Sequence, residues 1–220
     1  MARPPGSPVF FDVDGVLLDS LPQHLAMCRD KAREYGLSLD IPDVQQFRRM
    51  VASGVRVSPM LDFFLAVGFP PRLATEAVAA YESEFAQRYR PVMFPGIGAM
   101  LHRLSAAGHR LGLVTSNIAA NVEPPLRDVM ANFDPRCLFY VDGHQPPRSK
   151  SWCLLEGARI LGATPQDCVF VGDQPADAAA ARDGGWNFLG VSYGWGLLAG
   201  DPATPVVDTP AQIADTILGP

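Results

Sequence analysis

The chain has 220 residues, of which 48% are hydrophobic and 19% charged, and its net charge is −5. This composition is typical of a globular protein with one large domain, or with one domain and an insertion. The mild acidity and the lack of a Lys/Arg block argue against a nucleic-acid-binding surface, and no apolar run approaches the roughly 18 residues that a membrane span needs.

The first predicted strand, residues 9–11, ends in Asp12, Val13 and Asp14 and is followed by Gly15. Residues i and i+2 of a strand share a face, so both carboxylates start on the same side of the strand end. At the end of a buried strand two carboxylates are unfavourable unless a metal ion or a proton compensates them. The pattern alone fits either an Asp/Gly turn or an active site.

Residues 21–91 show helical periodicity without a convincing strand. In residues 21–35 apolar side chains recur at three- and four-residue spacing, and Gly36 follows as a helix stop. Further helices are predicted over residues 44–51, 60–67 and 73–89. We expect this all-helical block to be an insertion between the first strand and the rest of an α/β domain.

After residue 91 helices and short apolar strands alternate. The predicted helices are 97–107, 119–131, 151–161 and a short Ala-rich helix after residue 173, and the predicted strands are 111–115, 137–142, 168–173 and 188–192. This alternation predicts a parallel sheet covered by helices on both faces.

Polar side chains stand at the carboxyl ends of these strands. Thr115, Asp142 and Asp173 all fall at that end, as Asp12 does. Ligands of such sheets bind at the carboxyl ends of the strands, so these residues support the active-site interpretation of the aspartate pair.

Lysine occurs at only two positions, Lys31 and Lys150, against 16 arginines. The scarcity of lysine and the position of Lys150 between predicted strands favour a functional role for it. Lys31 lies on the first helix among charged neighbours, and a solvated helix face explains it.

Two observations concern the cellular compartment. Residues 1–8 carry no apolar signal-peptide core, so we expect a cytoplasmic protein. We expect it to be a monomer or a homodimer. The four cysteines form no Cys-x-x-Cys pair and are expected to be reduced core residues rather than zinc ligands or disulfides. They are Cys28, Cys137, Cys153 and Cys168.

Four segments of the chain resemble, in order, the four motifs of the haloacid dehalogenase-like superfamily. They are Asp12-Val13-Asp14-Gly15-Val16, Thr115, Lys150 and Gly172-Asp173-Gln174-Pro175-Ala176-Asp177. Phe94-Pro95-Gly96 and Val191-Ser192-Tyr193-Gly194-Trp195-Gly196 are further similar to the phosphoglycolate phosphatase-like branch. The chain departs from the usual pattern at Gln174, where Thr or Ser is common, and at Ser151, where Pro is common.

The resemblance implies an α/β fold with a doubly wound, Rossmann-like parallel sheet and an inserted helical cap. Residues 1–20 and 92–220 would form the catalytic core, and residues 21–91 the cap. It also implies a phosphatase that acts on a small phosphorylated metabolite, with a phosphoglycolate-like substrate as the first expectation.

In that reaction Asp12 would attack the phosphorus atom and form an aspartyl-phosphate. Asp14 would protonate the departing oxygen and later activate water, and the proximity of two carboxylates suits such an acid/base pairing because it raises one pKa.

The expected cofactor is Mg²⁺. Asp12, Asp173 and the backbone carbonyl of Asp14 would bind it, which matches the preference of this ion for carboxylates, phosphate and water. Asp177 would hold a metal-bound water or orient Lys150, or serve as a helix-start aspartate.

Thr115, Ser116 and Asn117 would bind a phosphoryl oxygen through the Thr115 hydroxyl and the next two backbone amides, and Lys150 would add a positive charge. Alternatively, Ser116 or Asn117 caps the following helix. His24 either contacts substrate or is a capping or packing residue. Arg48, Arg49 and Arg56 could pair with a substrate carboxylate, although such arginines are more often surface residues.

The resemblance also allows functions other than a phosphatase. The dehalogenases and the phosphonate-cleaving members of the superfamily lack an aspartate at the position of Asp14, so its presence favours phosphoryl transfer. A sugar-phosphate mutase would return the phosphoryl group to a bound sugar. An inactive phosphate-binding or scaffold protein is the remaining alternative, and the presence of all four charged motif positions argues against it.

Overall fold

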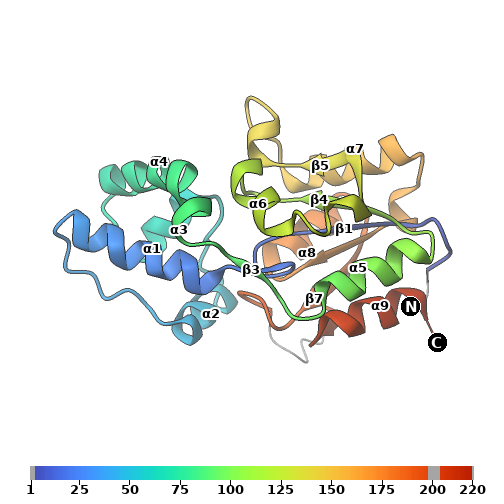
Figure 1. Ribbon diagram of the computed structural model, residues 1–220, viewed down its shortest axis with the longest axis horizontal. Coiled ribbons are helices and arrows are strands. Elements are labelled where there is room, and N and C mark those ends of the chain that lie inside the picture. The colour runs from blue at the N-terminus through green and yellow to red at the C-terminus, as the bar shows by residue number, and fades with distance from the viewer. Residues whose placement is uncertain (1–2, 198–203, 220) are drawn as a thin grey trace.

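A six-stranded parallel sheet forms the centre of the larger part of the protein (Figure 1). The computed structural model describes residues 3–197 and 204–219. The strands are β1 (Pro8–Phe11), β4 (Arg110–Val114), β5 (Phe133–Phe139), β6 (Val169–Gly172), β7 (Asn187–Val191) and β8 (Val206–Val207), in the order β5-β4-β1-β6-β7-β8. The chain moves outward from β1 first in one direction and then in the other, so the order reverses beside β1. In doubly wound sheets ligands bind at this reversal.

Both faces of the sheet are buried, which explains why its strands are almost continuously apolar. Val9 and Phe11 of β1 point into one hydrophobic cluster, and Phe10 points into the cluster on the opposite face, as the two-residue period of a strand requires. All three residues are fully buried.

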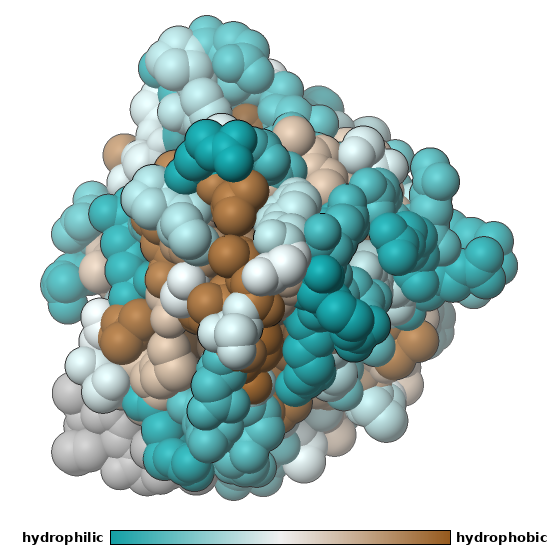
Figure 2. Space-filling view, turned by 90° about the vertical axis from the view of Figure 1, so that its left-hand side faces the viewer, coloured by the Kyte–Doolittle hydropathy of each residue, from teal (hydrophilic) through white to brown (hydrophobic). Residues whose placement is uncertain are grey.

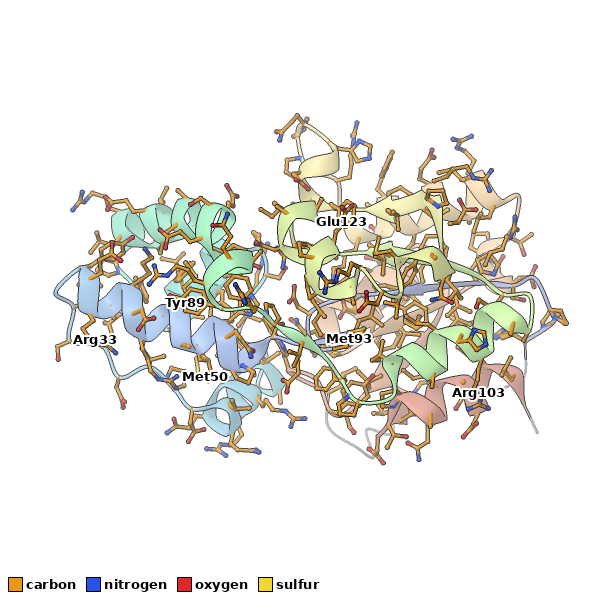
Figure 3. All side chains as sticks on the ribbon, viewed as in Figure 1. Arg33, Met50, Tyr89, Met93, Arg103 and Glu123 are labelled. Atoms are coloured by element: carbon orange, nitrogen blue, oxygen red, sulfur yellow. The ribbon has the colours of Figure 1, made fainter. Side chains whose placement is uncertain are left out.

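Helices cover the two faces of the sheet in separate layers. The first cluster joins the sheet to α5 (Ile97–Ala106), α6 (Ala119–Leu126) and α9 (Pro210–Leu218), and the second joins it to α7 (Lys150–Leu161) and α8 (Pro175–Asp183). In Figure 3 Arg103 marks α5 where it lies along α9, and its Nη2 is 2.8 Å from Asp215 Oδ1. The predicted α/β fold with helices on both faces is therefore confirmed.

The smaller part of the protein is a helical block with its own hydrophobic core. It consists of α1 (Leu21–Glu34), α2 (Val44–Ala52), α3 (Met60–Ala66) and α4 (Pro71–Arg88). Aromatic side chains dominate this core, including Phe47, Phe63 and Phe85, each fully buried. Figure 2 shows the outer face of the block, where hydrophilic residues predominate and a hydrophobic strip runs between them.

Two short antiparallel strands join the two parts of the protein. They lie where the chain leaves the α/β part that contains the sheet and where it returns to it. They are β2 (Leu18–Asp19) and β3 (Val92–Met93), with Leu18 opposite Met93. Met93 marks this junction in Figure 3. The sequence patterns did not predict this pair, and the elements β8 and α9 were also not predicted.

Two predicted elements differ from the structure. The helix predicted over 119–131 ends at Leu126, because Pro124 and Pro125 lack amide hydrogens and cannot extend the backbone hydrogen bonds; a separate 3₁₀ turn, Met130–Asn132, follows. The strand predicted over 137–142 instead spans β5, and Asp142 lies beyond it in a 3₁₀ turn, Val141–Gly143.

Among the helices that the structure describes, none is both long enough and apolar enough to traverse a bilayer.

The packing of α7 onto β1 leads to a stability prediction. A Cβ at Gly157 would lie 2.3 Å from Phe10 Cε2, whereas one at Gly98 of α5 would meet nothing closer than 3.7 Å. Gly157→Ala should therefore lower the free energy of unfolding by about 1–3 kcal/mol through overpacking. Gly98→Ala should be neutral or raise it by up to about 1 kcal/mol through helix propensity. Urea unfolding of both variants measures this, and a stabilised Gly157→Ala variant would contradict the tight contact with Phe10.

Candidate active site

The strand ends beside β1 bring the predicted charged residues together. Asp12 follows β1, Thr115 follows β4 and Asp173 follows β6, and these three strands are adjacent in the sheet. Asp173 begins the turn into α8, and Lys150 is the first residue of α7. The reversal of strand order thus gathers side chains from four separate segments of the sequence.

Three buried carboxylates form the centre of the site. Asp12, Asp173 and Asp177 each offer an oxygen, and these oxygens all lie within 4.8 Å of one another. The three residues are 4%, 0% and 1% exposed. Like charges this close in a buried position are unfavourable without a compensating cation.

Lys150 supplies part of that compensation. Its Nζ is 2.7 Å from Asp12 Oδ2 and 2.7 Å from Asp177 Oδ1. Burial alone would lower the pKa of Lys150, but the two carboxylates raise it above its usual value, so the side chain is an ammonium. Orientation of Lys150 was one of the roles expected of Asp177, and the structure shows the two residues in contact.

One ammonium does not balance three carboxylates. Burial raises the pKa of Asp12 to about 7, against the opposing effect of Lys150. Burial and the neighbouring charge of Asp177 raise the pKa of Asp173 well above its usual value. The site is therefore electrostatically prepared to accept a further positive charge.

One carboxylate oxygen of Asp173 accepts a hydrogen bond, and the other has no hydrogen-bond partner among the residues that the structure describes. Its Oδ2 accepts a hydrogen bond from the Trp195 amide at 2.5 Å, and its Oδ1 is buried with no hydrogen-bond partner among the described residues. Gly15 lies directly against this carboxylate at a positive φ of 81°, and a Cβ there would be 2.1 Å from Asp173 Oδ2. A buried carboxylate oxygen left free beside two other carboxylates is a suitable ligand for a hard cation.

Asp14 is held beside this cluster by two hydrogen bonds. Ser20 Oγ donates to its Oδ1 at 2.6 Å, and Asn117 Nδ2 donates to its Oδ2 at 2.8 Å. Its side chain therefore has a fixed orientation at the edge of the pocket described next.

A small pocket lies between the sheet edge and the helical block, with a volume of about 40 Å³. All four predicted catalytic residues line it, together with Ser116, Asn117 and His24 from the predicted phosphate-binding set. Tyr81 and Trp195 also line it. No role was predicted for these two aromatic residues, because helical periodicity places Tyr81 on an apolar helix face and Trp195 follows a strand without a charged neighbour.

The turn of residues 115–117, which was predicted to bind phosphate, differs in one detail from the prediction. The Asn117 amide donates to Thr115 Oγ1 at 3.1 Å, so in this conformation it is not free for a phosphoryl oxygen. The Asn117 side chain instead connects Asp14 to the start of α6, where its Oδ1 accepts from the Ile118 amide.

His24 lies deep between the helical block and the pocket, only 2% exposed. Its Nδ1 donates to the Ser20 carbonyl at 2.7 Å, and its Nε2 is 3.3 Å from the Tyr81 hydroxyl. Burial lowers the pKa of His24, so the imidazole is neutral. The structure thus gives it both a packing role and a place in the pocket wall.

Several predicted polar residues lie elsewhere. Asp142 accepts a hydrogen bond from the Ala119 amide at the start of α6 and does not line the pocket. The prediction of a solvated Lys31 is wrong: this residue is 3% exposed and its Nζ contacts Glu34 and, from a distant helix, Glu84. The prediction for the cysteines is confirmed, because all four are buried and free.

Comparison with known proteins agrees with this geometry. The model of the haloacid dehalogenase-like hydrolase family matches residues 9–185. A phosphoglycolate phosphatase from Xanthomonas campestris is 32% identical over 220 residues, covering 93% of each chain. An N-acetylmuramic acid 6-phosphate phosphatase from Pseudomonas aeruginosa is 28% identical and covers 95% of this chain and 93% of its own.

A solved structure shares the fold. A haloacid dehalogenase-like family protein from Streptococcus pneumoniae superposes with a TM-score of 0.78 at 21% identity, covering 96% of this chain and 98% of its own. Together with the family match and the relative at 32% identity, this shows that the chain belongs to the haloacid dehalogenase-like hydrolase family.

Proposed function

We propose that this hydrolase is a Mg²⁺-dependent phosphatase that transfers the phosphoryl group of a small metabolite to Asp12 and then to water. The observation that carries the proposal is the contact of Lys150 with both Asp12 and Asp177, next to a buried Asp173 oxygen that has no partner in the described part of the chain. The site therefore offers a nucleophilic carboxylate, a fixed ammonium and a carboxylate oxygen that can bind a further cation. The names of the relatives at 32% and 28% identity support the same reaction class.

Asp12 is the nucleophile in this proposal. One of its carboxylate oxygens attacks phosphorus, the bond from phosphorus to the substrate oxygen breaks, and an aspartyl-phosphate forms. Two interactions hold Asp12 for this step: the Lys150 ammonium, and the Val13 amide, which donates to Oδ1 at 2.8 Å. Lys150 then lies next to the phosphoryl oxygens, on which negative charge accumulates.

Asp14 moves the protons. In the first step it donates a proton to the departing alcohol oxygen, and in the second it removes a proton from the water that attacks the aspartyl-phosphate. The second attack breaks the bond between phosphorus and the Asp12 oxygen and restores both carboxyl groups. The hydrogen bonds from Ser20 and Asn117 keep the Asp14 side chain directed at the pocket during this exchange.

The residues present fit Mg²⁺. Asp12, Asp173 and the backbone carbonyl of Asp14 would hold the ion, which binds oxygen ligands and retains sites for water and phosphate. When bound, the ion would neutralise charge on the phosphate and on the crowded carboxylates. Asp177 stays bound to Lys150 and to the amides of Asp173 and Gln174, so it fixes the turn that carries Asp173.

The helical block acts as a cap in this proposal. The pocket of about 40 Å³ has space for a few water molecules but not for a phosphorylated metabolite. A neighbouring groove of about 480 Å³ shares Val57, Ser58 and Lys150 with the pocket. Movement of the block away from the sheet edge would widen the pocket for the phosphate group, and its return would exclude water around Asp12 before transfer.

The groove also distinguishes the three cap arginines that were expected to pair with a substrate carboxylate. Arg48 donates to the carbonyl of Ser192, and Arg49 is exposed and lines neither the pocket nor the groove. Arg56 lines the groove, with its Nε 2.7 Å from Asp62 Oδ2. Arg56 is therefore the cap arginine placed to meet a carboxylate on a phosphoglycolate-like substrate.

Replacement of the nucleophile tests the reaction itself. Asp12→Asn should lower Mg²⁺-dependent phosphate release from p-nitrophenyl phosphate by at least about three orders of magnitude, because the amide cannot form the covalent intermediate. Asp142→Asn, an acidic residue outside the pocket, is the matched control and should keep nearly full activity. Undiminished release by Asp12→Asn would refute the mechanism, and conversion of a sugar phosphate without free phosphate would favour a mutase.

Removal of one carboxylate should stabilise the metal-free protein. In Asp173→Asn the amide nitrogen would face the other two carboxylates as a donor, so the free energy of unfolding in EDTA near neutral pH should rise by about 1–2 kcal/mol. Added Mg²⁺ at about 100 times its dissociation constant should stabilise the wild type by about 2.7 kcal/mol and the variant hardly at all. Urea unfolding with and without Mg²⁺ measures both effects, and equal stabilisation of the two proteins by Mg²⁺ would contradict the assignment of Asp173.

The role of Arg56 is tested by substrate choice. Arg56→Gln should lower kcat/KM for 2-phosphoglycolate about thirtyfold, the equivalent of a charged hydrogen bond of about 2 kcal/mol. The same variant should leave p-nitrophenyl phosphate, which has no carboxylate, nearly unchanged. Arg49→Gln serves as the control. Equal losses on both substrates, or no loss on either, would show that Arg56 does not bind the carboxylate.

A further inference from the structure

Trp195 follows a strand of the sheet in sequence, but its side chain packs in the helical block. It follows β7, yet its side chain is part of the hydrophobic cluster formed by α1–α4 and is only 5% exposed. Its ring lies 5.1 Å from His24, 5.9 Å from Phe47 and 5.7 Å from Phe63, measured between ring centroids. The ring is thus inserted into the cap while its backbone stays with the sheet.

The backbone around Trp195 holds Asp173 at the same time. The Trp195 amide donates to Asp173 Oδ2 at 2.5 Å, and the amides of Gly196 and Leu197 donate to the Asp173 carbonyl at 3.2 and 2.8 Å. Three consecutive amides therefore bind one residue of the carboxylate cluster.

Gly194 and Gly196 flank Trp195, and neither position in the 192–197 segment has space for a side chain. A Cβ at Gly194 would lie 2.3 Å from Asp173 Cβ, and one at Gly196 would lie 2.3 Å from Val51 Cγ1 of α2. The segment is therefore in direct contact with Asp173 on one side and with the helical block on the other. A second link to the block comes from Arg48 of α2, which donates to the Ser192 carbonyl.

We propose that Trp195 is a positioning residue that couples the helical block to Asp173, so that the affinity for Mg²⁺ depends on the seating of its ring in the block. The inference rests on the proposed role of Asp173 as a metal ligand. The ring anchors the 192–197 segment in the cap, and the amide of the same residue orients the Asp173 carboxylate. Movement of the helical block is then transmitted to the metal site through the Trp195 side chain. The affinity for Mg²⁺ is higher when the block is docked against the sheet edge.

The test compares Mg²⁺ affinity in variants that alter the same hydrophobic core. By isothermal titration calorimetry, Trp195→Leu should bind Mg²⁺ about tenfold more weakly than the wild type, which is typical when a group that orients a metal ligand is lost. Trp195→Phe, which restores a ring, should recover most of the affinity. Phe64→Leu is the matched control, because Phe64 is buried in the same core and its ring contacts are with Phe63 and Phe69. This control should bind Mg²⁺ like the wild type.

A spectroscopic readout separates coupling from simple loss of stability. In a Trp152→Phe/Trp186→Phe variant Trp195 is the only tryptophan, and its fluorescence should change on addition of Mg²⁺. Equal Mg²⁺ affinities of Trp195→Leu and Phe64→Leu, or a Trp195 fluorescence that does not respond to bound Mg²⁺, would overturn the coupling. Wild-type Mg²⁺ affinity in Asp173→Asn would instead overturn the proposed metal site, so the two failures are distinguishable.

Discussion

Three buried carboxylates that share a single ammonium are the constraint on which the rest of this structure depends. Asp12, Asp173 and Asp177 lie within 4.8 Å of one another, and Lys150 contacts two of them. Such a cluster is stable only if the surrounding fold enforces it and a further cation can relieve it. In the mechanism that we propose, the same charge imbalance prepares the site for Mg²⁺ and for the transfer of a charged phosphoryl group.

The fold enforces the cluster from several directions. The central strand β1 is buried on both faces, which fixes the position of Asp12 at its end. Gly15 allows the loop after β1 to pass directly against Asp173, since any side chain there would collide with that carboxylate. The helical block closes the remaining side of the site, and the 192–197 segment connects it to Asp173. Packing in the clusters on the two faces of the sheet and in the helical block therefore supports one polar centre.

Much of this arrangement was predictable from sequence because it depends on local patterns. Apolar strands that alternate with helices predicted the doubly wound sheet, and polar residues at strand ends predicted the positions of Asp12, Thr115 and Asp173. What could not be predicted depends on contacts between distant residues. Lys31 is buried because Glu84, on another helix, pairs with it. Trp195 enters the cap although its neighbours in sequence belong to the core, and no local periodicity signals such an exchange.

The most direct test of the central claim is to trap the phosphorylated enzyme. Wild-type protein mixed with substrate and Mg²⁺, quenched in acid and digested, can be analysed by mass spectrometry for an added phosphoryl group. Phosphoryl transfer to Asp12 predicts this added mass on the peptide that contains Asp12, with loss of the modification in Asp12→Asn. A phosphoryl group found only on another residue would contradict the claim that Asp12 is the nucleophile. Turnover without any phosphorylated peptide would contradict it as well.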